Sequence, residues 1–436
     1  MSDPFAGDGA TDPVSPDATG VYVTGNTTYD STIDAGVTDL YIKYAYDEGC
    51  AGAGLLPIVA MFHGYIGDAD SLTSTDLGRW AARGFLAASF GLRGRNGATG
   101  SRDASGREIH DAIDGMAHLR ALFDGMVRTD HAAAVGWSGG GANVLGLRCK
   151  SDLFTVTADF FGPCYFGPGP YGWYEYGVDY DSDILLDADL GGSPEALPLV
   201  YSARDVRPAI AKAMALGGWL WMGHDSEDVS VSIHGTDDMK SALDAARLTN
   251  YTYTRTTALS ATRCHHGHPT DSADLVTLEN QFARRMRDTD PLIIPTSGSL
   301  LLMGFYKSVT RDFEVWVGDE ANPRTNGTGG TNRRALLAYD VTAGRYTVTP
   351  LDGPCTVYLR HGNTVVTAST TLAARTVTID AVAGTATQTG NDLDGAPRAW
   401  RPVLAGSAPV SPWVPTGATA IDWHTATRRA SAVTLT

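Results

Sequence analysis

The chain has 436 residues, a formal net charge of −16 and 43% hydrophobic residues. This length favours two domains, and the apolar share is sufficient for a packed core. The acidic balance argues against nucleic acid or an anionic membrane as a partner, and favours a neutral or cationic ligand. Five scattered cysteines without CxxC spacing argue against a zinc ribbon, although one or two disulfides remain compatible with them.

The first residues contain neither the basic region nor the apolar region of a secretory signal. No apolar run approaches the roughly 20 residues that span a bilayer. The sequence therefore predicts a soluble chain, either cytoplasmic or part of an extracellular or virion assembly.

Apolar runs and amphipathic stretches alternate after an extended arm at residues 1–19. Such alternation predicts a mostly parallel sheet with helices on both faces, here within a domain at 20–289. The predicted strands are 39–47, 55–62, 84–90, 132–135, 154–161 and 229–233, with a further candidate at 251–257. The predicted helices are 71–83, 109–126, a helix after residue 138, and 272–287.

Two parts of the chain depart from this alternation. Residues 162–228 begin with a stretch dense in aromatic residues, glycine and proline, which we interpret as a lid-like insertion over the sheet. Residues 290–436 consist of short Thr-, Val-, Leu- and Tyr-rich runs between turn residues, typical of an all-β, sandwich-like domain. This domain ends in a tail rich in proline and tryptophan, which starts at residue 390.

The strongest chemical signal is Gly136-Trp137-Ser138-Gly139-Gly140, a G-x-S-x-G motif between an apolar strand and a helix. A serine on such a sharp turn needs small neighbours, and the following helix directs free N–H groups toward a developing oxyanion. The motif predicts Ser138 as a nucleophile. The alternative is a glycine-rich turn that only packs.

A serine nucleophile needs a base and an orienting acid. Three histidines lie in the loop before the last helix of the domain, and we select His266, with His268 as the alternative base and His265 third. A metal site in this loop is the other interpretation, but no matching ligand spacing surrounds it, so no metal is expected. The candidates for the orienting acid lie in the segment His234-Gly235-Thr236-Asp237-Asp238. We select Asp238, with Asp237 as the second candidate, although either aspartate could merely cap the following helix.

An oxyanion hole needs two backbone N–H donors. Gly139 would supply one, and Tyr65, in the His63-Gly64-Tyr65 turn, the other. Trp137, Tyr165 and Trp173 are candidate substrate-binding residues. Tyr165 and Trp173 could equally well belong to the apolar core of the lid. Arg93, Arg95 and Arg102 could bind a substrate carboxylate, but ion pairs within their loop explain them better.

The H-G-Y turn, the G-x-S-x-G motif, the H-G-T-x-D segment and the late histidine together resemble the α/β-hydrolase superfamily. The resemblance covers about residues 40–288 and is greatest to the branch of dienelactone-hydrolase-like, acetyl-esterase-like and prolyl-oligopeptidase-like enzymes. It implies Ser138 as nucleophile, His266 as base, Asp238 as orienting residue, and Tyr65 and Gly139 as oxyanion donors. The insertion and the C-terminal part match no branch.

These observations predict a serine hydrolase that cleaves carboxylic esters through an acyl-enzyme intermediate, without a cofactor. The substrate would be a small-molecule or polymeric ester. One alternative is a serine peptidase of the prolyl-oligopeptidase-like type, although too few residues precede the domain for a propeller. The other is a binding or structural protein, such as a virion component, that carries a hydrolase domain.

Overall fold

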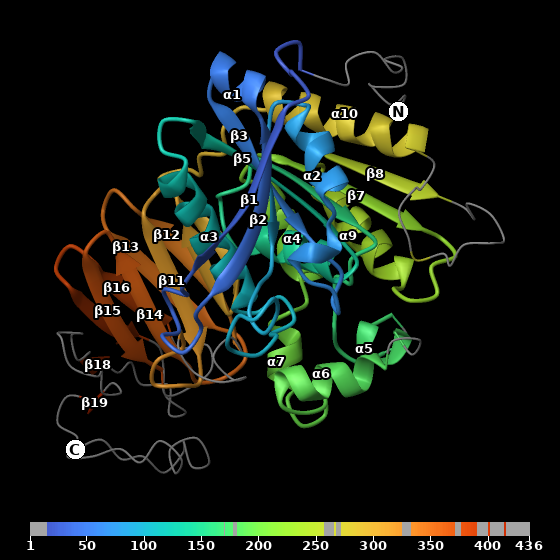
Figure 1. The fold of residues 1–436 in the computed structure, drawn as a ribbon. Helices are drawn as coiled ribbons and strands as arrows, with labels where there is room; N and C mark the ends of the chain where they lie inside the picture. Colours follow the sequence, from blue (N-terminus) through green and yellow to red (C-terminus); the bar gives the residue numbers. More distant parts are fainter. Residues whose placement is uncertain are drawn as a thin grey trace.

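The computed structural model describes residues 15–169, 171–177, 181–256, 266, 272–324, 333–370, 376–389, 400–401 and 414–415. The chain forms two large sheets, which lie next to each other (Figure 1). The elements from β1 to α10, residues 22–288, form an α/β part. The strands from residue 297 onward, drawn in orange and red, form the second sheet.

The first sheet has the strand order β1-β2-β4-β3-β5-β6-β7-β8. Its first two strands pair antiparallel, as do β2 and β4, and the remaining pairs are parallel. The predicted mostly parallel sheet is therefore confirmed. The strands are β1 (Tyr22–Tyr29), β2 (Leu40–Asp47), β3 (Leu56–Phe62), β4 (Leu86–Phe90), β5 (Val127–Trp137), β6 (Val156–Phe160), β7 (Trp219–Asp225) and β8 (Tyr251–Thr256).

Helices cover both faces of this sheet, because the buried strands present apolar side chains alternately to each side. Ile58, Ala60 and Phe62 of β3 pack in one core with residues of α3 (Glu108–Leu122) and α4 (Gly139–Lys150). Val59 and Met61 pack in the opposite core, with α2 (Ser74–Ala81) and α10 (Ser272–Asp288). A short α1 (Glu48–Ala53) follows β2, and the 3-10 helix η1 (Ala69–Ser71) precedes α2.

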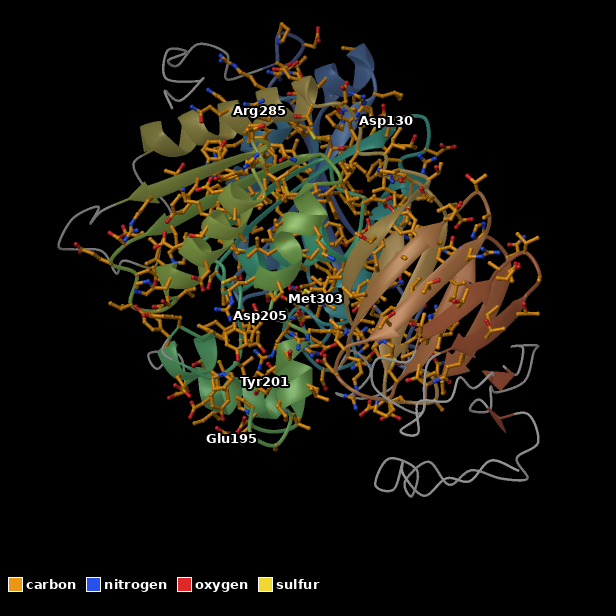
Figure 2. All side chains as sticks on the ribbon, turned by 180° about the vertical axis from the view of Figure 1, so that it is seen from behind. Asp130, Glu195, Tyr201, Asp205, Arg285 and Met303 are labelled. Atoms are coloured by element: carbon orange, nitrogen blue, oxygen red, sulfur yellow. The ribbon has the colours of Figure 1, made fainter. Side chains whose placement is uncertain are left out.

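A helical insertion separates β6 from β7. Figure 2 shows Tyr201 and Glu195 in this insertion, which projects from the body of the protein. It contains α5 (Trp173–Tyr176), α6 (Ser182–Leu190), α7 (Pro198–Ser202) and α8 (Arg207–Met214). Phe166, Trp173 and Tyr201 of the insertion belong to an apolar core that also includes Tyr65 and Ala142 of the α/β part.

The strand predicted at residues 229–233 is wrong. The sheet strand is β7, which ends at Asp225, eight residues before the predicted end, and Ile233 instead begins α9 (Ile233–Ala245). The alternation of Val229, Val231 and Ile233 resembles a strand, but Asp228 folds this segment into a turn by accepting the amides of Ser230 and Val231. The insertion therefore ends before β7 rather than at residue 228.

The second sheet is antiparallel throughout, in the order β15-β14-β11-β10-β9-β12-β13-β16-β17-β18-β19. The predicted all-β character of the C-terminal part is confirmed for its described residues. The strands are β9 (Ser297–Met303), β10 (Phe305–Ser308), β11 (Phe313–Gly318), β12 (Arg334–Asp340), β13 (Arg345–Pro350), β14 (Thr356–His361), β15 (Thr364–Ser369), β16 (Thr376–Asp380), β17 (Thr385–Thr389), β18 (Trp400–Arg401) and β19 (Val414–Pro415).

The two parts of the protein share a buried interface. Phe305 and Trp316 of the second sheet stack on each other and belong to the same apolar core as α3. Met303, labelled in Figure 2, packs with Met214 of α8 in another shared core. His110 of α3 lies between Asp114 and Glu314 in this interface, at 3.2 Å and 3.3 Å.

Candidate active site

Ser138 occupies the sharp turn between β5 and α4, with φ 54° and ψ −125°. A non-glycine residue in this conformation is strained by about 1–3 kcal/mol and persists only where the surroundings impose it. The neighbours are small because the space is filled: a Cβ on Gly136 would collide with the carbonyl oxygen of Gly140, and one on Gly140 with that of Phe62. The turn therefore holds the serine at the carboxyl edge of the sheet.

His266 contacts both Ser138 and an acidic residue. Its Nε2 lies 2.8 Å from Oγ of Ser138, and its Nδ1 lies 2.9 Å from Oδ2 of Asp228. Because a carboxylate only accepts, Nδ1 carries the proton and Nε2 is left to accept from the serine hydroxyl. The ring of Phe161 packs edge-on against the imidazole, with the centroids 4.8 Å apart. His265 and His268, the two other candidate bases, lie outside the described residues.

Asp228 follows β7 and is fully buried as a side chain. Its Oδ1 accepts the amides of Ser230 and Val231, and Nε2 of His224 lies 3.3 Å from its Oδ2. Burial alone would raise the pKa of Asp228, but hydrogen bonds from His224 and His266 outweigh it and lower the pKa to about 2. The carboxylate that faces His266 is therefore ionised at neutral pH.

The structure does not bring Asp238 to His266, which corrects the predicted acid. Asp238 lies on the exposed side of α9 and pairs with Arg207 at 3.2 Å. Asp237 pairs with Arg255 instead. Both aspartates belong to α9 rather than to the loop after a strand, because the residues just before this helix form a turn instead of the predicted strand. The matching signal in the sequence is the apolar run 219–222, followed by His224 and then by Asp228.

The Tyr65 turn and the first residue of α4 lie against each other. A Cβ on Gly139 would be 2.5 Å from the backbone nitrogen of Tyr65 and 2.6 Å from its Cα. Gly139 is the first residue of its helix, where the backbone N–H has no intrahelical acceptor. The backbone of Tyr65 thus packs directly against Gly139, the residue that follows Ser138.

Tyr65 makes polar contacts through both its side chain and its backbone. Its hydroxyl donates to Oδ2 of Asp189 on α6 over 2.6 Å, and Arg102 pairs with the same carboxylate at 3.1 Å. Arg95 donates to the Tyr65 carbonyl oxygen over 3.1 Å and pairs with Glu108 at 2.7 Å. Arg93 pairs with Asp111 at 2.6 Å. All three arginines of this loop thus take part in ion pairs.

The three aromatic residues predicted to bind substrate lie in different surroundings. Trp137 is half-buried and stacks on Phe160. Tyr165 is half-buried beneath the guanidinium of Arg207, which lies 4.6 Å from its ring centroid. Trp173 is buried, with its ring 4.9 Å from that of Tyr65. Trp173 thus contacts the Tyr65 turn directly.

Sequence reasoning missed two further residues that contact this site. Tyr176 on α5 donates its hydroxyl to the carbonyl oxygen of Asp228 over 2.8 Å. Asp189 on α6 accepts a hydrogen bond from the Tyr65 hydroxyl. Both come from the insertion, whose helices have no motif that marks a partner in the sequence. The insertion therefore touches both the acid and the Tyr65 turn.

Chemically, this arrangement can activate a hydroxyl. A neutral imidazole at 2.8 Å from Ser138 Oγ can take its proton, and an ionised carboxylate can stabilise the resulting imidazolium. The sheet order and the serine on the sharp turn between β5 and α4 define the class: this protein has the α/β-hydrolase fold.

The protein is structurally similar to α/β-hydrolase esterases and to prolyl-oligopeptidase-family peptidases. The puromycin hydrolase structure matches with a TM-score of 0.51 and 17% identity, covering 65% of this chain and 42% of that one. Acylaminoacyl peptidase of Pyrococcus horikoshii gives 0.49 and 14%, covering 62% and 42%. Esterase Pf2001 of Pyrococcus furiosus gives 0.44 and 12%, covering 62% and 93%.

At these identities the likeness concerns the fold. In sequence, the chain matches no protein-family model and no curated protein. Among the described residues, no helix is long and apolar enough to cross a membrane.

Proposed function

We propose that the protein is a serine hydrolase that cleaves carboxylic esters through an acyl-enzyme intermediate. The observation that carries the proposal is the continuous hydrogen-bonded series from Ser138 Oγ through His266 to Asp228. The strained backbone of Ser138 supports it, because such strain is typical of functional positions.

In the proposed reaction, Oγ of Ser138 attacks the ester carbonyl while Nε2 of His266 takes its proton. Asp228, instead of the predicted Asp238, orients the imidazole and stabilises its positive charge. The amides of Tyr65 and Gly139 stabilise the oxyanion, and loss of one such donor typically costs about 3 kcal/mol in the transition state. His266 then protonates the leaving alcohol, and water releases the acyl group.

The test is labelling with a fluorophosphonate probe together with hydrolysis of p-nitrophenyl acyl esters of increasing chain length. We expect wild type to be labelled and active, and Ser138→Ala to lose both properties. Ser241→Ala is the matched control, since this exposed serine only donates to the Asp237 carbonyl, and it should behave as wild type. A folded wild type that resists labelling, or a Ser138→Ala protein that remains active, would refute the proposal.

The same preparation separates esterase from peptidase. Peptide anilides contain an amide bond in place of the ester bond, and the aniline is a poorer leaving group than p-nitrophenol. We expect ester cleavage to be much faster. Faster cleavage of anilides would instead assign the protein to the peptidases.

A further inference from the structure

A buried carboxyl group lies against the first turn of α4, the helix that follows Ser138, and takes no part in the hydrogen-bonded series described above. Asp159 is on β6 and is 0% exposed. Val156, Ala158 and Phe160 of the same strand pack toward α2 and α10. The alternation of the strand therefore turns Asp159 to the other face, against α4. The contact is close, because a Cβ on Gly141 would collide with its Oδ1.

The two oxygens of this carboxyl group differ. Oδ1 accepts the amide of Gly162 over 2.9 Å, whereas Oδ2 is buried and has no hydrogen-bond partner among the described residues. Burial raises the pKa of Asp159 to about 8, against the opposing effect of the Gly162 hydrogen bond. A buried carboxylate without a cation is costly, so the group keeps its proton at neutral pH.

The elements packed against Asp159 provide little charge to balance it. Its sheet partners are Gly136 on β5 and Met222 on β7, and the first turn of α4 consists of glycines. The charge of Asp159 acts on Cys164, whose thiol pKa is raised mainly by burial and also by nearby carboxylates, Asp159 among them. His266 packs against the ring of Phe161, two residues beyond Asp159.

The turn at residues 160–162, whose Gly162 amide donates to Asp159, contacts both Ser138 and His266. The carbonyl oxygen of Phe160 accepts the Ser138 amide over 2.9 Å. The next residue, Phe161, has φ 45°, and its ring packs against His266. Gly162 follows and is held by Asp159. A change at this carboxyl group would therefore reach the nucleophile and the base through one short stretch of backbone.

We propose that Asp159 is a positioning residue that acts in its protonated form, and that its ionisation lowers the hydrolase activity at alkaline pH. On ionisation the proton leaves to solvent, and the negative charge remains beneath the first turn of α4. The oxyanion would form at that turn, so the two negative charges would repel each other in a medium of low dielectric constant. The inference rests on the proposed function.

The test is the pH dependence of kcat for a p-nitrophenyl ester in wild type, Asp159→Asn and Thr157→Val. Asparagine keeps the acceptor for Gly162 but cannot ionise. We expect wild type to lose activity above about pH 8, by about tenfold for each further pH unit, and Asp159→Asn to lack this decline. Thr157→Val, a buried change on the same face of β6, should keep the decline. An identical decline in wild type and Asp159→Asn would overturn the inference.

Infrared spectroscopy gives a second measurement that does not depend on activity. The carbonyl band of a protonated carboxylic acid should be present in wild type at neutral pH and disappear with the same midpoint as the kinetic decline. The band should be missing from Asp159→Asn, and wild type alone suffices if that variant does not fold. The lack of a titrating band would overturn the inference, whereas an inactive, unlabelled wild type would refute the proposed function itself.

Discussion

The hydroxyl of Tyr65 donates to Oδ2 of Asp189 over 2.6 Å, which connects the proposed oxyanion turn to helix α6 of the insertion. Burial and the nearby charge of Asp189 raise the pKa of Tyr65 well above its usual value, so the hydroxyl remains a donor. Because this proton is committed to Asp189, the backbone amide of Tyr65 is the group available to an oxyanion.

Tyr65→Phe separates these two roles. The variant leaves Asp189 with one fewer donor and should lower the free energy of unfolding by about 1–3 kcal/mol, while kcat falls less than about tenfold. Chemical denaturation and ester hydrolysis measure the two effects. Tyr174→Phe, which removes a hydroxyl that donates to Asp187 in the same insertion, is the control and should have little effect on kcat. A loss of about 100-fold or more in Tyr65→Phe would instead make the hydroxyl itself the oxyanion donor.

Two aspartates ten residues apart should respond very differently to the same change. Asp228→Asn removes the charge that faces His266 and allows the wrong imidazole tautomer, so kcat should fall by about 10³–10⁴-fold. Asp238→Asn only breaks an exposed pair with Arg207 and should stay within about twofold of wild type. Ester hydrolysis and probe labelling of both purified variants measure this contrast. Equal losses in the two variants would contradict the assignment of Asp228.

The interface histidine predicts how stability depends on pH. Burial would lower the pKa of His110, and Lys307 acts in the same direction, but the charges of Asp114 and Glu314 prevail and raise it. A raised pKa means that the folded protein favours protonated His110. Its contribution is complete below the usual value of about 6.5 and is lost as the pH rises through the folded value.

We therefore expect the melting temperature of wild type to fall as the pH rises above neutral, and to fall less in His110→Gln. His118→Gln is the control on the same helix, because burial lowers the pKa of His118 and its effect has the opposite sign. Differential scanning calorimetry across this range measures both. Parallel curves for wild type and His110→Gln would contradict the prediction.

Glycines of α4 should differ sharply in their tolerance of alanine. In Gly140→Ala the new methyl group would collide with backbone atoms of Phe62 and His63, which cannot move without displacing β3. We expect a loss of ester hydrolysis of at least about 100-fold, comparable to removal of an oxyanion donor. Gly146→Ala meets the flexible end of Ile109 at 2.9 Å instead and should remain active. Full activity in Gly140→Ala would show that the turn is not tightly packed.

The sequence predicts the α/β core well, because its strands are buried apolar runs and its helices are amphipathic. The prediction failed at β7, where Trp219 and Trp221 lie beside two glycines and look less like a strand than the alternating run after them. The assignment of the acid failed with it, since the position of an acid is inferred from the strand before it. The contacts from Tyr176 and Asp189 were beyond prediction, because they depend on how the insertion packs in three dimensions.

The position of α4 has a consequence for how this protein can be divided. Just beyond its end, Asp152 accepts the Ser308 hydroxyl over 2.6 Å and the Val309 amide over 2.6 Å, both from the C-terminal part. Leu145 of the same helix shares a core with Met303 of the second sheet and Met214 of α8. The helix that begins at the proposed nucleophile thus ends on the C-terminal sheet. Neither part can be exchanged alone. If the α/β part were fused to a different C-terminal domain, the surface against which α4 packs would have to be redesigned.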